Sequence, residues 1–255
     1  MTQGRTIEEW LPPPGDMRLG ADDVHLWMSS IDLSSDVTRA LAKWLSRDER
    51  GRAERFRHDV HRDRFIAGRA MMRGVLANYV DADPGDIEFE YLAHGKPRFA
   101  GAAEGVEFNL SHSGDVALLA VNAGAAIGVD VERIRELRDM HGLANRFFAP
   151  SEAAQIENER EDRRIESFFR CWTRKEAYVK AIGEGITCAL DSFEVSIARE
   201  SPARLVHIDQ DETIAADWSM VSIVPAAQYV GALATRKKLG AVHSWLWDAE
   251  SHAPR

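Results

Sequence analysis

Asp130 and Glu132 are the first candidates for chemistry, because they stand two residues apart in the run Gly128-Val129-Asp130-Val131-Glu132. In a β-strand alternate side chains point the same way, so both carboxylates would share one face while the valines pack on the other. Paired carboxylate oxygens suit Mg²⁺. The alternative is the solvated polar face of an edge strand.

A third carboxylate, Glu176, precedes Lys180 by four residues in a helical segment that ends at Gly183. Residues four apart lie on the same face of a helix. Glu176 could complete a metal site, and Lys180 could stabilise charge on a phosphate oxygen. The alternative is a surface ion pair worth roughly a few tenths of a kcal/mol. Lys175, which directly precedes Glu176, could have a structural role.

Upstream of these residues, two predicted turns carry groups that can hold an anion. Gly95-Lys96-Pro97 has turn chemistry and places Lys96 at its tip. Ser111-His112-Ser113-Gly114 follows a strand-like run and offers hydroxyl and imidazole groups to a phosphate, although each motif alone also fits an ordinary turn. A serine-hydrolase elbow is excluded, because Gly-x-Ser-x-Gly is absent around Ser111 and Ser113.

Composition narrows the classes of function. The formal net charge of -9 and the pI near 5.5 argue against a protein that neutralises nucleic-acid phosphates. Cys171 and Cys188 are too few for a zinc knuckle. There is no phosphate-binding Gly-x4-Gly-Lys loop and no His-Glu-x-x-His motif. No signal peptide and no run near the roughly 20 apolar residues of a membrane span are visible, so we expect a soluble, cytoplasmic protein.

The elements that must position these groups follow one plan twice, which predicts an α+β fold. Each half begins with a strand, continues with helices and ends with short strands. A weak echo between residues 64–69 and 171–176 supports duplication. We therefore expect two similar α/β lobes in a pseudo-twofold arrangement, residues 1–125 and 126–255, with an active site in the cleft between them. Each lobe would pack a small, mainly antiparallel sheet on a long helix. The expected strands are 24–28, 87–91, 106–110, 116–121, 126–132, 193–197, 205–208, 218–224 and 229–234, and the helical regions are 36–80 and 150–182.

Taken in order, the motifs are Gly-Lys-Pro, Phe-Asn-Leu-Ser-His-Ser, Gly-Val-Asp-Val-Glu, Arg-Phe-Phe and Trp-x-x-Lys-Glu-Ala-x-x-Lys. This series resembles the 4′-phosphopantetheinyl transferases, and more narrowly their two-lobed, Sfp-like branch. The resemblance runs from about Leu45 to Ala234. It implies transfer of the phosphopantetheine arm of coenzyme A to a serine of an apo carrier protein, with release of adenosine 3′,5′-bisphosphate.

The resemblance also implies roles for the three carboxylates. Asp130, Glu132 and Glu176 would hold Mg²⁺, with Mn²⁺ as a substitute, against the pyrophosphate. Glu176 is the first choice for the general base on the carrier serine, and Glu132 is the second. Lys180 would stabilise the negative charge that develops on the pyrophosphate.

Coenzyme A, the co-substrate, would be held largely by the first lobe, which supplies the 3′-phosphate contacts. The second lobe would supply the magnesium site and the catalytic helix, including Lys180, which also contacts coenzyme A. The positions that match coenzyme A ligands of the family are Arg64, Lys96, Pro97, Ser111 and His112. One departure is Glu49, where a basic residue is expected. Arg50 or Arg52 would then take over that contact.

The implied partner is an acyl or peptidyl carrier protein, docked on the stretch Ile134 to Met140, which mixes apolar residues with Arg135 and Arg138. A carrier of polyketide or nonribosomal peptide biosynthesis is the leading expectation, and one of fatty acid biosynthesis the second. Fused lobes predict a monomer. The alternatives are another magnesium-dependent enzyme, such as a phosphohydrolase, and a non-catalytic relative that only binds carrier proteins.

Overall fold

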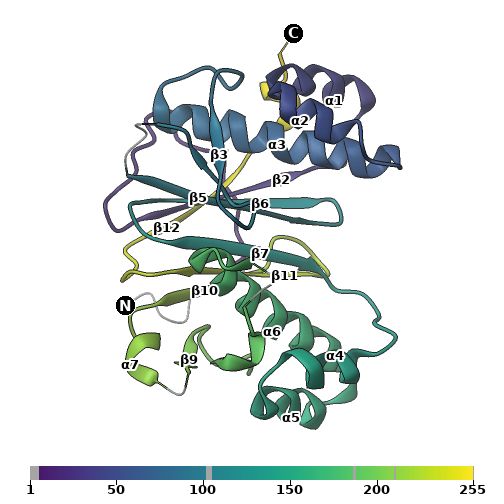
Figure 1. Cartoon of the computed structure of the whole chain (residues 1–255), viewed down its shortest axis with the longest axis vertical. Coiled ribbons are helices and arrows are strands. Elements are labelled where there is room, and N and C mark those ends of the chain that lie inside the picture. The colour runs from purple at the N-terminus through teal and green to yellow at the C-terminus, as the bar shows by residue number, and fades with distance from the viewer. Residues whose placement is uncertain (1–5, 102–104, 186–187, 210, 255) are drawn as a thin grey trace.

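Four layers make up the computed structural model, which describes residues 6–101, 105–185, 188–209 and 211–254. Figure 1 shows two sheets face to face in the middle, with the long helix α3 (Asp59–Val80) covering one outer side and α6 (Glu161–Ile182) covering the other. The predicted α+β class is confirmed, with small mixed sheets and helices. No helix of the described residues has the length and apolar character needed to cross a membrane.

The first half of the chain supplies one sheet and its helix. Its strands and helices fall on or close to the predicted ranges, and the short helices α1 and α2 lie beside α3 (Figure 1). The elements are β2 (Val24–Ser30), α1 (Ser35–Leu41), the 3-10 helix η1 (Ala42–Trp44), α2 (Arg47–Ala53), α3, β3 (Phe89–Tyr91), β4 (Pro97–Phe99), β5 (Val106–Ser113) and β6 (Val116–Ala123).

The second half follows a similar order of elements, with one further short helix, α7, and a different place for its 3-10 helix. Its elements are β7 (Ile127–Arg133), α4 (Met140–Phe147), α5 (Pro150–Asn158), α6, the 3-10 helix η3 (Leu190–Ser192), β8 (Phe193–Val195), β9 (Leu205–Ile208), α7 (Glu212–Ala215), β10 (Ser219–Ile223) and β11 (Tyr229–Thr235). Three further elements lie nearer the chain ends: β1 (Thr6–Ile7), β12 (Val242–Leu246) and α8 (Ala249–His252).

Each four-stranded sheet takes one strand from the opposite end of the chain. The strand orders are β12-β2-β6-β5 and β1-β10-β11-β7. The added strands pair in parallel, β12 with β2 and β1 with β10, whereas the other neighbours are antiparallel. The division into lobes at residues 1–125 and 126–255 stays a prediction, and the two end strands cross it.

Three hydrophobic cores hold the layers together, and the side chains of β6 alternate between two of them. Ala117, Leu119 and Val121 pack toward α3, whereas Val116, Leu118 and Ala120 belong to the core between the sheets. A strand buried on both faces reads as a continuous apolar run, as this one does. The third core lies between the second sheet and α6.

Two close approaches position the edge strand β7. Gly128 has no room for a side chain, because a Cβ there would lie 2.1 Å from the carbonyl oxygen of Ala177 and 2.5 Å from the backbone nitrogen of Ala181 in α6. On its other side β7 lies next to β5 of the first sheet, where the Asn109 Oδ1 accepts the Val129 N–H at 2.9 Å. One strand is thus fitted against the second long helix and the edge of the first sheet.

Candidate active site

Asp130, in β7, is the point at which both halves of the chain meet. Its side chain is buried, with 5% of the residue exposed. The Asp130 Oδ1 accepts the Ser111 hydroxyl of β5 at 2.9 Å and pairs with the Lys180 Nζ of α6 at 2.6 Å. The Lys180 Nζ also donates to the Ser111 Oγ at 2.8 Å. The structure therefore brings together three residues that the sequence assigned to one site.

The second carboxylate oxygen of Asp130 is buried and has no hydrogen-bond partner among the described residues. Burial raises the pKa of Asp130, against the opposing attraction of Lys180. An unsatisfied buried polar group costs about 1–3 kcal/mol, and more when it is charged. A divalent cation such as Mg²⁺ prefers oxygen ligands, so it would be a suitable partner for this carboxylate oxygen. The residues present therefore fit a metal ion at this point.

Glu132 lies two residues further along β7 and is half-buried. It accepts the Ser113 hydroxyl at 2.6 Å and pairs with Arg135 at 3.2 Å. Ser111 and Ser113 are themselves two residues apart on β5, so their side chains face the same way. The alternation of β5 thus matches that of β7, and each hydroxyl orients one carboxylate.

Glu176 lies on α6, one turn before Lys180, and is half-buried. Burial raises the pKa of Glu176, and the negative charge of Asp130 raises it further, while Lys180 opposes both. A carboxylate with a raised pKa is a better proton acceptor near neutral pH. Its position on α6 follows from the close contact of that helix with β7.

The three carboxylates do not form a ready-made metal cage. In the part of the chain that the structure describes, no group of three or more His, Cys, Asp and Glu side chains is arranged to hold a metal ion. Asp130 is instead paired with Lys180, and Glu132 with Arg135. The magnesium site stays a prediction, supported by the unsatisfied oxygen of Asp130.

Arg64 adds positive charge next to this group, and His112 adds an imidazole. His112 follows Ser111 on β5, and its side chain is exposed. Partial loss of water around its ring lowers the pKa of His112, and the charges of Lys180 and Arg64 lower it further. Arg64 lies on α3, and its Nε is buried without a hydrogen-bond partner. An anion bound here would meet the unsatisfied N–H donor of Arg64.

Comparison with known proteins agrees with this arrangement. The profile described as 4′-phosphopantetheinyl transferase superfamily matches residues 126–234, and the profile of the 4′-phosphopantetheinyl transferase N-terminal region matches residues 32–124. The chain is 41% identical to the 4′-phosphopantetheinyl transferase HetI of Nostoc sp., over 88% of this chain and 92% of that protein. The chain belongs to the 4′-phosphopantetheinyl transferase superfamily.

Within the superfamily this transferase falls in the Sfp-like branch. It is 28% identical to the 4′-phosphopantetheinyl transferase Sfp of Bacillus subtilis, over 66% of this chain and 73% of that protein. Among solved structures it is similar to the holo-[acyl-carrier-protein] synthase of Thermotoga maritima, at 18% identity and a TM-score of 0.35, over 45% of this chain and 64% of that one.

Lys96 of this transferase has a different environment from the one expected of a phosphate ligand. It stands at the tip of the β3–β4 hairpin, directly before Pro97, the first residue of β4. Its Nζ donates to the carbonyl oxygens of Ile127 and Lys180, both at 2.9 Å, and of Ala181 at 3.3 Å. All three acceptors belong to the second half of the chain.

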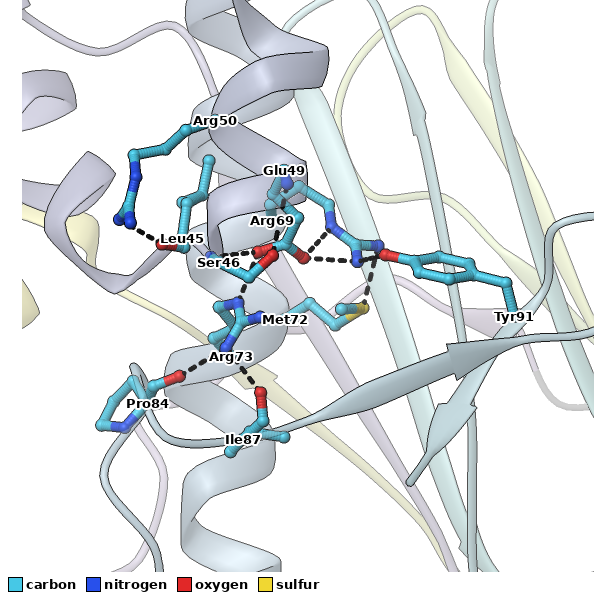
Figure 2. A network of polar contacts seen from close by, with 10 residues as sticks. All are labelled: Leu45, Ser46, Glu49, Arg50, Arg69, Met72, Arg73, Pro84, Ile87 and Tyr91. Atoms are coloured by element: carbon cyan, nitrogen blue, oxygen red, sulfur yellow. Dashed lines mark hydrogen bonds and ion pairs between the residues drawn. The ribbon is translucent and has the colours of Figure 1, made fainter. Parts of the chain in front are cut away.

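Glu49, where a basic residue was expected, is a buried structural group of the transferase. Figure 2 shows its carboxylate between two arginines of α3. The Arg69 Nε donates to one oxygen at 2.7 Å and the Arg73 Nε to the other at 2.7 Å. Glu49 also completes a capping box with Ser46 at the start of α2. The Ser-x-x-Glu spacing was the sequence signal for this role.

Arg50 and Arg52 differ in how free they are to bind a ligand. Arg50 donates to the carbonyl oxygen of Leu45 (Figure 2). Arg52 lies over the ring of Phe65, with 5.2 Å between its Cζ and the ring centroid. Both residues are exposed, so the difference between them lies in these contacts alone. Which of the two contacts coenzyme A stays a prediction.

Lys175, which the sequence left open, is enclosed in the second half. None of its side chain is exposed, and its Nζ pairs with Glu152 of α5 at 2.7 Å. It also donates to the carbonyl oxygens of Leu190 at 2.7 Å and Phe193 at 2.6 Å. These contacts give Lys175 a structural role.

Proposed function

We propose that this transferase moves the phosphopantetheine arm of coenzyme A to a serine hydroxyl of an apo carrier protein and releases adenosine 3′,5′-bisphosphate. The observation that carries the proposal is the convergence of Asp130, Ser111 and Lys180, from both halves, next to Glu176. This cluster combines carboxylates for a metal ion with a lysine and a hydroxyl for phosphate oxygens.

Asp130, Glu132 and Glu176 are the residues that would hold Mg²⁺, with Mn²⁺ as a substitute. When bound, the metal would neutralise charge on the pyrophosphate of coenzyme A. The partnerless oxygen of Asp130 supports this assignment. Ser111 and Ser113 orient two of the three carboxylates through their hydroxyls.

Glu176 is our first choice for the general base that takes the proton of the carrier serine. The raised pKa of Glu176, caused by burial and by Asp130, favours this task. Glu132 is the second choice. Lys180 would stabilise the charge that develops on the pyrophosphate, because its Nζ already lies beside Ser111 and Asp130.

The nucleotide end of coenzyme A is assigned to the first half. Arg64 would provide a buried N–H donor and the positive charge that a 3′-phosphate requires, and the His112 imidazole and the Ser111 hydroxyl would add hydrogen bonds. Lys96 and Pro97 were predicted for the same end. The Lys96 ammonium would have to leave its three carbonyl partners to reach it.

The carrier protein is proposed to dock on the groove that follows β7. This groove of about 660 Å³ runs along the loop after β7 and the first turns of α6. Ile134, Leu137 and Met140 are partly buried on the core of the second half, and Arg135 and Arg138 are exposed beside them. Apolar contacts with a basic rim suit an acidic helix of a carrier.

The two halves are proposed to be lobes, residues 1–125 and 126–255, related by a pseudo-twofold axis. The common order of elements supports this, because β2-β6-β5 and β7-β11-β10 are equivalent runs of neighbouring strands. The active site would lie between the lobes, where β5 meets β7. With both lobes in one chain, we expect a cytoplasmic monomer that acts on carriers of polyketide or nonribosomal peptide synthesis, with fatty acid carriers second.

Intact-mass spectrometry of an apo carrier protein tests the proposal. With coenzyme A and Mg²⁺, the transferase should add the mass of phosphopantetheine to the carrier, and chelation of the metal should stop the reaction. Panels of polyketide, peptide and fatty acid carriers identify the preferred one. Hydrolysis of coenzyme A without carrier modification would favour a phosphohydrolase, and carrier binding without any mass gain would favour a non-catalytic relative.

A further inference from the structure

The C-terminal turn of α6 is held by a residue from the other half of the chain. Lys96, at the tip of the β3–β4 hairpin, donates to the carbonyl oxygens of Lys180 and Ala181 in that turn. Its third acceptor is the carbonyl oxygen of Ile127, the first residue of β7. One ammonium group therefore joins the hairpin, the end of α6 and the start of β7.

The chemistry of a helix end explains why a cation belongs at this place. The last four carbonyl oxygens of an α-helix have no partner within the helix, and they form the negative end of its dipole. In α6 the N–H of Gly183 satisfies the carbonyl oxygen of Val179. The Lys96 ammonium satisfies the next two carbonyl oxygens and adds a favourable charge.

A second contact fits the same hairpin to the chain just beyond α6. Gly185 has a positive φ of 61°, and a Cβ at this position would lie 2.9 Å from the Cβ of His94. His94 precedes Lys96 by two residues in the hairpin. The hairpin thus follows the backbone past the helix end, and the contact does not depend on one flexible side chain.

We propose that Lys96 is a positioning residue, which fixes the last turn of α6 and with it the side chain of Lys180. The carbonyl oxygen of Lys180 is held by Lys96 at 2.9 Å, while the ammonium of the same residue reaches Asp130 at 2.6 Å. The first half thereby sets where the cation of the second half acts. The inference rests on the proposed function, because it concerns the step that Lys180 serves.

The test compares Lys96→Met with the wild-type protein on two substrates, coenzyme A and 3′-dephospho-coenzyme A. A displaced Lys180 lowers kcat, on the order of 10- to 100-fold, because small errors in the position of a catalytic group are costly. The loss should be the same for both substrates, since Lys96 does not contact the 3′-phosphate. A rise in KM for coenzyme A alone, with kcat unchanged, would overturn the proposal in favour of a phosphate ligand.

Hydrogen exchange followed by mass spectrometry gives a readout that needs no activity. Lys96→Met should speed exchange in the backbone of residues 179–183 and leave residues 161–168 unchanged. Lys96→Arg, which keeps the charge and the N–H donors, should restore protection and most of kcat. Lys238→Met, at an exposed lysine, is the matched control. Unchanged exchange in Lys96→Met, or loss of protection in the Lys238 control, would contradict the proposal.

These measurements separate the inference from the proposed function. If the wild-type protein modifies no carrier, the proposed function fails, and the exchange data still decide whether Lys96 holds the end of α6. If Lys96→Met does not fold, the kinetics of Lys96→Arg on the two substrates decide. A defect confined to coenzyme A would then count against the positioning role.

Discussion

The two long helices, α3 and α6, are held in the same way but do different work. Each is preceded by a short helix whose buried glutamate accepts the backbone N–H of the N-cap residue and pairs with a basic residue of the long helix. In the first half Glu49 of α2 pairs with Arg73, and in the second Glu152 of α5 pairs with Lys175. Arg73 and Lys175 stand at the same position counted from the start of their helices.

The next residue along each helix shows where the two diverge. In α3 it is Gly74, where an added Cβ would lie 3.0 Å from the ring of Trp44 and 3.1 Å from that of Trp247. In α6 it is Glu176, whose carboxylate belongs to the candidate site. One scaffold thus serves two purposes: α3 packs against aromatic rings, whereas α6 lies close to β7 and presents the groups that react.

Glu176→Gln should produce the largest effect if, of the two long helices, only α6 carries a reacting group. The change keeps the size of the side chain but removes the proton acceptor, so kcat should fall on the order of 100- to 10,000-fold. Mass gain of the carrier over time measures this, and thermal unfolding should be close to wild type. Activity within threefold of wild type in a folded Glu176→Gln protein would remove Glu176 from the site.

Breaking the buried pair of either half should cost about 3–5 kcal/mol of unfolding free energy, because it leaves an unpaired buried charge. Glu152→Ala should cost more than Glu49→Ala, since Lys175 is fully enclosed whereas the side chains of Arg73 and Arg69, the two partners of Glu49, are 2% and 10% exposed. Urea unfolding measures both. The exposed pair of Arg39 and Asp36 provides the control, and removing it should change little.

The double variant Glu152→Gln with Lys175→Met tests whether the loss of unfolding free energy in Glu152→Ala comes from leaving the buried charge of Lys175 unpaired. It removes both charges and keeps similar volumes, so it should be more stable than Glu152→Ala. If the double variant is the less stable one, the pair itself contributes the stability.

Gly128→Ala and Gly68→Ala test the closeness of the helix packing in the two halves. A Cβ at Gly128 collides with α6, so the first change should cost about 1–3 kcal/mol and lower kcat. Gly68, inside α3, has no atom within 4 Å of an added Cβ. Its change to alanine should stabilise the protein by up to about 1 kcal/mol. Urea unfolding and carrier kinetics check both, and equal effects would show that α6 is no more tightly packed than α3.

The smallest expected effect is a loss, at acidic pH, of the stability that Glu49 contributes. Burial disfavours the charge on Glu49, but Arg69, the Ser46 N–H and Arg73 outweigh it and lower the pKa of Glu49 below 4.5. A lowered pKa contributes stability above that pH, which is lost as pH falls through the folded-state pKa. The difference in unfolding free energy between wild type and Glu49→Gln should therefore narrow below about pH 4.5. A gap that widens in acid would contradict this.

Local patterns were sufficient to predict the elements that carry the site. The alternation of Asp130 and Glu132 with valines predicts β7 and its polar face, and the four-residue spacing of Glu176 and Lys180 predicts one face of α6. These signals lie within a few residues of each other, where backbone periodicity alone sets which side chains share a face.

Contacts between distant segments could not be read in the same way. The parallel pairing of β12 with β2 joins residues more than two hundred positions apart and leaves no local pattern. Glu49 stood out only as a departure from the expected basic residue, because its ion pairs with Arg69 and Arg73 join segments about twenty residues apart, which no local pattern shows. Lys96 has the chemistry of an anion ligand, yet its acceptors are backbone carbonyls of another element, which no side-chain motif encodes.

The exchange of end strands between the two sheets has a consequence for synthesis of the chain on the ribosome. The first sheet contains β2, from the first half of the chain, and among the described residues the edge of β2 that faces away from β6 pairs with β12. Until Val242–Leu246 has left the ribosome, that edge remains open to pairing with other chains. Completion of the half that is made first therefore waits until the last strand of the second half has been made, and the nascent chain has to be protected for that time.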